Sequence, residues 1–138
     1  MIMNEDFVSY EIAKKLKEKG FREKCKKHCY PNSQDWFTSS MPECDNFSNY
    51  LDIPTISQVL KWLREEKKFY VVPLICSDWS EDADGIICEE WLFWSYRVIN
   101  VNDGRIVYDE LDKIDNGNFE DYERAALAGI KYVLDNLI

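Results

Sequence analysis

The sequence predicts one α+β domain over residues 1–138, with a mainly antiparallel sheet of about four strands and three helices packed largely on one face. Two observations lead to this fold class. Three segments repeat apolar residues at intervals of three or four, the period of an amphipathic helix, whereas the apolar residues between them alternate or run together, as in strands. An Asn-Asp-Gly turn signal at residues 102–104 joins two strand segments as a hairpin, which favours antiparallel pairing.

The first helix is predicted between Ser9, which suits its N-cap, and Gly20, which closes its last turn. Its buried stripe has helical spacing and consists of Ile12, Ala13 and Leu16. Residues 21–30 are predicted as a short strand, at a sheet edge because it is polar. The period of a strand puts three of its residues on one side, Phe21, Cys25 and Cys29.

Residues 31–53 are predicted to be irregular, since they are rich in Pro, Asn, Asp and Ser. A loop of this length is unusual inside a compact domain. Either it contains a hairpin, or its aromatic residues tether it to the core; these are Trp36, Phe37, Phe47 and Tyr50. The second helix opens at Pro54 and Thr55, where a missing backbone donor costs least. Its buried stripe consists of Ile56, Val59, Leu60 and Leu63.

The second half of the chain carries most of the predicted sheet. Residues 69–76 are apolar and β-branched, typical of an inner strand, but Pro73 cannot donate to a ladder and argues for an edge or a bulge. Residues 77–85 are predicted as an acidic surface loop. Residues 86–101 form a long strand with alternating side chains, and residues 105–108 return after the turn.

The last helix has the clearest pattern in the chain. Asp121 suits its N-cap. Its apolar residues follow spacings of four, four, three and four, and they are Tyr122, Ala126, Ile130, Val133 and Leu137. A stripe of this width is expected for a helix packed on a sheet.

Three stretches of the chain together carry a resemblance: EIAKKLKEKGF (11–21), PTISQVLKWLREEKKFYVVP (54–73) and FEDYERAALAGIKYVLDNLI (119–138). This set resembles a family of small uncharacterised proteins from Bacteroides-type gut bacteria, their prophages and related mobile elements. The resemblance implies a shared fold and a phage or mobile-element origin. It implies no activity, ligand or catalytic residue. The acidic segment 77–88 and the cysteine content depart from the family pattern.

The charge balance limits the class of partner. The chain carries 17 basic and 26 acidic residues, a formal net charge of −9, so direct binding to a phosphate backbone is not expected. The basic stretch from Lys14 to Lys27 is interrupted by Glu18 and Glu23 and is interpreted as a solvated face. With no apolar run of membrane-spanning length, no signal peptide and an odd number of cysteines, we expect a cytoplasmic protein with free thiols and no membrane partner.

No catalytic, cofactor or metal residue is predicted. Cys25, His28, Cys29 and Cys44 contain zinc-binding groups, but paired Cys-x-x-Cys knuckles are missing. We therefore interpret the cysteines as buried or incidental and the histidine as a surface residue. The acidic pairs at residues 89–90 and 109–110 are interpreted as a solvated acidic face. The chain is thus expected to be neither an enzyme nor a cofactor protein.

Aromatic residues gather around the acidic segment, and they give the candidate interaction surface: Trp79, Trp91, Phe93 and Trp94. Indole rings combine a large apolar area with one hydrogen-bond donor, a combination that recurs at binding surfaces. The alternative is that alternate aromatic residues of one strand pack under the helices and the others cover the second sheet face.

Two functional hypotheses follow. The first is a non-enzymatic protein-interaction domain with a protein partner, for which a homodimer formed through an open sheet face or edge is the simplest case. The second is an acidic protein that mimics nucleic acid and inhibits a host DNA or RNA enzyme. The second requires clustered surface charge, whereas acids and bases are mixed along most of the predicted elements.

Overall fold

The computed structural model describes residues 6–25, 27–29, 36–38, 51–110 and 119–138. These residues form an α+β fold with antiparallel pairing throughout. The elements follow the order α1 (Tyr10–Glu18), β1 (Lys27–Cys29), β2 (Trp36–Thr38), β3 (Leu51–Ile53), α2 (Ile56–Trp62) with a π-helical turn η2 (Leu63–Lys67), β4 (Phe69–Glu81), β5 (Ile87–Asn100), β6 (Ile106–Asp109) and α3 (Tyr122–Asn136).

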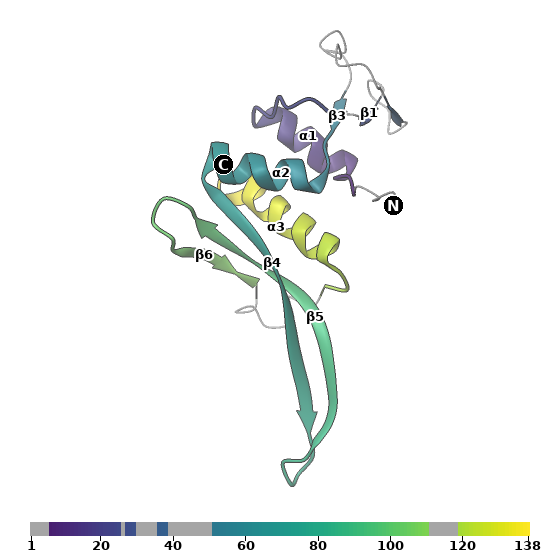
Figure 1. Cartoon of the computed structure of the whole chain (residues 1–138), viewed down its shortest axis with the longest axis vertical. Helices are drawn as coiled ribbons and strands as arrows, with labels where there is room; N and C mark the ends of the chain where they lie inside the picture. The colour runs from purple at the N-terminus through teal and green to yellow at the C-terminus, as the bar shows by residue number, and fades with distance from the viewer. Residues whose placement is uncertain (1–5, 26, 30–35, 39–50, 111–118) are drawn as a thin grey trace.

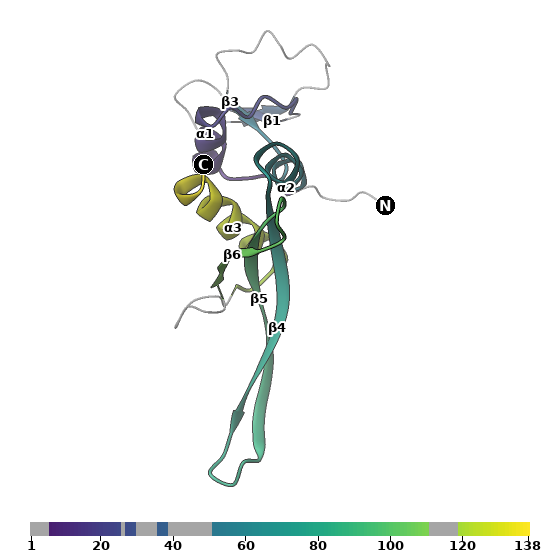
Figure 2. The same ribbon diagram turned by 90° about the vertical axis from the view of Figure 1, so that its left-hand side faces the viewer.

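The strands divide into two sheets. A small sheet has the order β2-β1-β3, and a larger sheet has the order β4-β5-β6. The three helices gather at one end of the molecule, and β4 and β5 form a long hairpin whose far half projects away from them (Figures 1 and 2). None of the helices in the described residues combines the length and apolar character needed to span a membrane.

The hydrophobic core extends from α1 and α2 to α3, and one part of it lies between α3 and the near half of the β4–β5 hairpin. Val71 on β4 and Tyr96 and Val98 on β5 are buried against the buried residues of α3, which are Ala125, Ala126, Gly129, Ile130, Val133 and Leu134. The helix approaches the sheet closely at Gly129, where an added Cβ atom would overlap Val71 Cγ1. This contact explains why a glycine is tolerated in the middle of a helix, where it is otherwise unfavourable.

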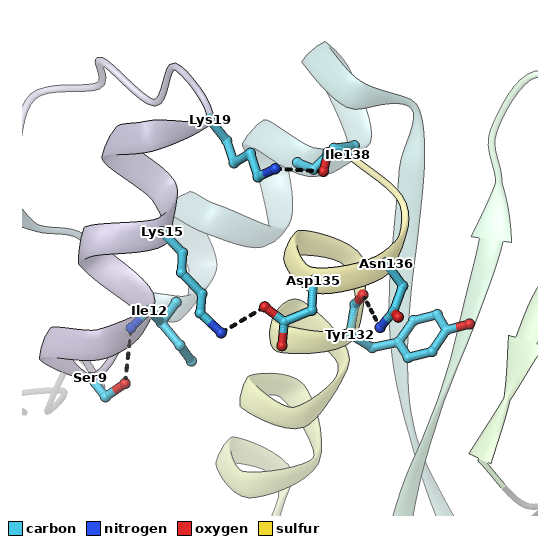
Figure 3. Close-up of polar contacts among 8 residues, drawn as sticks. All are labelled: Ser9, Ile12, Lys15, Lys19, Tyr132, Asp135, Asn136 and Ile138. Carbon is cyan, nitrogen blue, oxygen red and sulfur yellow. Dashed lines mark hydrogen bonds and ion pairs between the residues drawn. The ribbon is translucent and has the colours of Figure 1, made fainter.

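Polar contacts join α1 to α3 at the surface (Figure 3). Lys15 Nζ lies 2.6 Å from Asp135 Oδ1, and Lys19 Nζ donates to the carbonyl oxygen of Ile138 at 2.7 Å. Ser9 caps α1 as predicted, because its Oγ accepts a hydrogen bond from the backbone N–H of Ile12. The contacts of Lys15 and Lys19 hold the first and last helices together, although these helices are far apart in the sequence.

The second helix also begins where the sequence predicts. Thr55 is its N-cap and forms a reciprocal capping box with Gln58. The helix continues into the π-helical turn η2 and ends at Lys68. Lys68 has a positive φ of 63°, which is unusual for a residue other than glycine. Lys68 leads directly into β4, so its left-handed conformation turns the chain from helix to strand.

The prediction of one sheet of about four strands is only roughly matched, because the described strands form two sheets of three strands each. The predicted strand at residues 21–30 pairs only over β1, and it is the middle strand of the small sheet rather than an edge. Residues 31–53, predicted to be irregular, contribute β2 and β3. Both strands pair with β1 and not with each other, so the described residues do not confirm the alternative of a hairpin inside this segment. The burial of Phe21, Cys25 and Cys29 is confirmed. Strands of three residues are too short for their side-chain alternation to be recognised in the sequence.

The larger sheet matches the predictions except at its far end. Pro73 lies on an edge strand, and residues 102–104 form the turn before β6, with Gly104 at φ 72°. The predicted acidic loop at residues 77–85 is wrong, because β4 continues through Glu81 and pairs with β5. The turn itself spans Asp82 to Ile86, and the Asp82 carboxylate accepts hydrogen bonds from the backbone N–H groups of Asp84 and Ile86.

Candidate interaction surface on the hairpin arm

The far half of the β4–β5 hairpin lies beyond the helices. We define the arm as residues 76–93, which continue the hairpin past the cross-strand pair Ile75–Trp94. At that pair, Trp94 exchanges backbone hydrogen bonds with Phe119 and meets the Tyr122 ring edge-on at 5.7 Å. Residues 81–92 are exposed without exception. The arm is therefore a paired β-ribbon that α3 does not cover (Figure 1).

Strand pairing gives the arm two chemically distinct faces, because residues directly opposite each other share a face. The face that continues from the α3 contact, here called the inner face, carries the pairs Ser77–Leu92 and Trp79–Glu90. The other face, here called the outer face, carries three pairs: Cys76–Phe93, Asp78–Trp91 and Ser80–Glu89. Apolar residues thus occur on both faces of a ribbon that no described helix covers.

The structure separates the four aromatic residues predicted as an interaction surface. Trp94 contacts α3 and Phe93 is partly buried, so these two contribute to the base of the arm. Trp79 and Trp91 lie on opposite faces of the arm, with 51% and 43% of their surface exposed. The alternative that aromatic residues of this strand pack under the helices is met in part by Trp94, which is partly buried against α3, and not by Trp79 or Trp91.

Other large apolar side chains extend this exposed surface. Ile75 at the base and Leu92 in the arm are 58% and 70% exposed on the inner face. Ile86 and Ile87 are exposed beside the turn. A contiguous apolar stripe, from Ile75 through Leu92 to Trp79, therefore continues the sheet face that α3 buries in the body of the protein.

The arm is also strongly acidic. It contains six carboxylates and no lysine, arginine or histidine, and the acidic residues are Asp78, Glu81, Asp82, Asp84, Glu89 and Glu90. All six are exposed. The Glu81 carboxylate accepts a hydrogen bond from Trp79 Nε1 at 3.0 Å, which orients the indole ring. Pairing of the two strands thus brings separate acidic stretches of the sequence together around exposed tryptophans.

The prediction of a surface histidine is wrong. The His28 side chain is fully buried in the small sheet, and its Nδ1 lies 2.7 Å from Asp52 Oδ1 on β3. Asp52 lies directly across from His28 in the strand register, so pairing with a residue 24 positions away provides the polar contact that makes burial possible. Cys25 and Cys29 are also buried, as interpreted, whereas Cys44 lies outside the described residues.

The described residues contain no group of three or more His, Cys, Asp or Glu side chains that could hold a metal ion. A shallow cleft lies beside α2, and its lining is polar and mixed in charge: Glu23, Gln58, Lys61, Trp62, Glu65 and Glu66. Nucleophilic catalysis requires a nucleophile paired with a base. This lining supplies no cysteine, serine or histidine for such a pair.

The pair at residues 109–110, predicted to be solvated, is instead partly internal. Asp109 receives a hydrogen bond from Arg97 Nε at 2.9 Å, and Glu110 is 7% exposed. Tyr108 donates its hydroxyl to Glu110 Oε2 at 2.5 Å and stacks between the rings of Tyr96 and Tyr132. Sequence reasoning missed this cluster, although the predicted return strand after the turn would place Tyr108 near Tyr96.

The tyrosine–glutamate cluster favours uncharged tyrosines. Burial, followed by the hydrogen bond and charge of Glu110, raises the pKa of Tyr108 to about 12. Burial is also the main cause that raises the pKa of Tyr96, and the Glu110 carboxylate adds to it. Neutral tyrosines therefore remain donors to a buried carboxylate over the whole physiological range, which is a structural arrangement of satisfied polar groups.

Comparison with models of protein families, with curated proteins and with solved structures finds no match to this chain. The functional argument therefore rests on the arm, whose surface combines exposed tryptophans with concentrated acidic charge.

Proposed function

We propose that this protein is a non-enzymatic protein-interaction domain and that the arm is the element that contacts the partner. The observation that carries this proposal is the exposure of Trp79 and Trp91 on an arm with no basic residue. Tryptophan is enriched among residues that contribute most to binding energy. A β-paired backbone holds these rings in place before binding, so little conformational entropy is lost on association.

The chemistry of the arm indicates a basic partner surface. Six carboxylates without a neutralising cation attract a surface rich in lysine and arginine and repel an acidic one. The apolar stripe of Ile75, Leu92 and Trp79 then requires apolar groups between those cations. The resemblance to proteins of gut-bacterial prophages and mobile elements supports an origin of this kind, in which the partner is a phage or host protein.

The proposal is tested with an arm-deleted variant. Cys76 and Phe93 face each other across the hairpin, so an Asn-Gly turn can join them and leave the body of the sheet unchanged. Proteins that bind to the immobilised intact chain but not to the immobilised variant are identified. Each is then purified and titrated against the chain by calorimetry.

Substitutions then locate the binding energy. Trp79→Ala or Trp91→Ala is expected to weaken binding of the purified partner by about 2 kcal/mol or more. Ile87→Ser in the arm is compared with Ile106→Ser on β6, because the two side chains have similar exposure, 51% and 53%. The proposal would be refuted if all these variants and the arm-deleted chain bound the purified partner with the same affinity as the original chain.

A second candidate function is favoured by the clustering of the six carboxylates. In this reading the arm imitates the phosphates of a nucleic acid and blocks a host DNA or RNA enzyme. Neutralising Glu81, Asp82, Asp84, Glu89 and Glu90 as amides would abolish inhibition, whereas Trp79→Ala would leave it nearly unchanged. Undiminished inhibition by the neutralised variant would exclude this function.

A further inference from the structure

The edge of β4 that faces away from β5 is open along the arm. β4 is the terminal strand in the order β4-β5-β6, and no strand in the described parts of the chain pairs with its other side. Because Trp94 exchanges backbone hydrogen bonds with Phe119, its N–H and C=O groups point away from β4. In an antiparallel pair the direct partner, Ile75, then points its own N–H and C=O groups away from β5.

Alternation along β4 gives Pro73, Ser77 and Trp79 the same orientation as Ile75. Pro73 has no N–H group, so it interrupts any strand addition at the body of the protein and costs the hairpin no hydrogen bond. Beyond it, Ile75 and Ser77 each present a free-facing N–H and C=O group at the edge, whereas the Trp79 N–H donates to Asp78 Oδ1 at 2.8 Å and only its C=O group is left at the edge. The open edge therefore begins at Ile75, where the helices end.

The side chains beside this edge specify what an added strand must carry. On the inner face, the exposed side chains of Ile75 and Trp79 flank the edge, so the added strand needs apolar residues on this side. On the outer face, Asp78 lies at the edge and Glu89 lies behind it on β5. The added strand therefore needs lysine or arginine at the alternating positions.

Charge decides between a second copy of this chain and a different partner. In a dimer formed through the same edge, each β4 would bring its own Asp78 and Glu81, and each arm would bring six carboxylates and no cation. Like charges across an interface are unfavourable, whereas a basic strand would neutralise them. The opposing requirement for apolar residues on the inner face excludes a uniformly basic segment.

We propose that the arm binds an extended segment of a partner protein, with alternating apolar and basic residues, by adding it as a strand to the β4 edge from Ile75 to Glu81. This inference rests on the proposed function and deepens it, because it names the backbone groups and the residue pattern that the partner must match. Strand addition obtains affinity from main-chain hydrogen bonds and specificity from alternate side chains.

The test uses an eight-residue peptide of alternating valine and lysine with blocked ends. Two controls are a peptide of the same composition with the lysines and valines in two blocks, and an alternating valine–glutamate peptide. The alternating basic peptide is expected to bind about tenfold more tightly than either control. Binding is expected to slow hydrogen exchange at the amides of Ile75 and Ser77, which face away from β5.

A proline substitution tests the edge directly. Ser77→Pro removes a free-facing donor at the same kind of position that Pro73 already occupies, and it is expected to weaken peptide binding about tenfold, whereas Ser77→Ala is not. If Ser77→Pro fails to fold, peptides N-methylated on one or the other set of alternating residues replace it. Only methylation of the residues that face β4 is expected to abolish binding.

Several results would overturn the inference. Equal affinity for the alternating and block basic peptides would show that charge alone attracts them. A dimer that Ser77→Pro converts to monomer would assign the edge to a second copy of the chain. A partner that requires Trp79 and Trp91 but is unaffected by Ser77→Pro would refute the edge and leave the proposed function standing. A partner unaffected by arm deletion would refute the proposed function as well.

Discussion

At the scale of single residues, Gly129 sets the distance between α3 and the hairpin. An added Cβ atom would overlap Val71 Cγ1 and lie 3.1 Å from Tyr96 Cδ2. In an exposed helix, replacing glycine by alanine stabilises by about 1 kcal/mol. Here we expect Gly129→Ala to lower the free energy of unfolding by about 1–3 kcal/mol, measured by urea denaturation, because the overlap must be relieved by moving the helix.

The same substitution in a Val71→Ala background is the control. Removing Val71 Cγ1 makes room for the new methyl group, so Gly129→Ala should then cost about 1 kcal/mol less than in the original chain. Identical costs in the two backgrounds would show that the contact with Val71 is not the reason for the glycine.

Lys68 gives a prediction of the opposite sign. Its φ of 63° lies in the left-handed region, which costs a non-glycine residue about 1 kcal/mol. Lys68→Gly is expected to leave the free energy of unfolding unchanged or to raise it by up to about 1 kcal/mol, and Lys68→Val to lower it. Lys67→Gly, in the preceding helical turn, is the matched control and should destabilise. Destabilisation by Lys68→Gly would contradict the backbone argument.

Tyr108 predicts how stability depends on alkaline pH. The pKa of Tyr108 is raised from 10 to about 12 in the folded protein. The folded state therefore favours the protonated hydroxyl, and this contribution to stability is complete below pH 10 and is lost as the pH rises towards 12. Tyrosinate absorbance should show a titration step at about pH 12 that Tyr108→Phe removes. A normal titration of every tyrosine would refute it.

At the scale of secondary-structure elements, what the sequence could predict depended on local signals. The N-caps Ser9, Thr55 and Asp121 lie directly before the helices that they begin. The start of each of α1, α2 and α3 could therefore be predicted from neighbouring residues. Residues 77–81 were predicted as loop because serine, aspartate and glutamate have low β propensity. Their strand is fixed by cross-strand partners in residues 87–92, and local composition does not contain that pairing.

The arm is an element that contributes little to the stability of the rest. Residues 81–92 are exposed, so replacing residues 77–92 by an Asn-Gly turn removes little buried apolar surface. We expect the free energy of unfolding of this variant to stay within about 1 kcal/mol of the intact chain, measured by chemical denaturation. By contrast, Trp94→Ala at the base of the arm should lower the free energy of unfolding by about 3 kcal/mol or more, because Trp94 contacts Tyr122 on α3. Unfolding of the arm-deleted chain would show that the arm supports the core.

At the scale of the whole molecule, the fold places the basic stretch and the acidic segment of the sequence at opposite ends (Figure 1). Residues 14–27 contain eight basic and two acidic residues. Those that the structure describes, 14–25 and 27, lie at the helical end of the molecule (Figure 1). The arm, with six acidic residues and no basic one, lies at the other end (Figure 1). The net charge of −9 was available from composition. The location of the negative charge in the fold was not available, because residues 78–84 lie beside residues 89–90 only when the two strands pair. For the same reason, exposure of Trp79 and burial of His28 depend on partners distant in the sequence.

This charge distribution predicts the oligomeric state and its salt dependence. At low ionic strength the chain is expected to be a monomer, because two arms that approach through their apolar stripes also bring their carboxylates together. At about 1 M salt the Debye length falls to about 3 Å, so the repulsion is screened and the exposed apolar residues should begin to associate. Light scattering coupled to size-exclusion chromatography, in reducing buffer and at several protein concentrations, measures this. A variant with residues 81, 82, 84, 89 and 90 as amides should associate already at low salt, whereas the same variant with Trp79→Ala should associate less. A salt-independent dimer of the original chain would mean that self-pairing already occupies a surface of the molecule, and the arm-deleted variant would then show whether that surface is the arm.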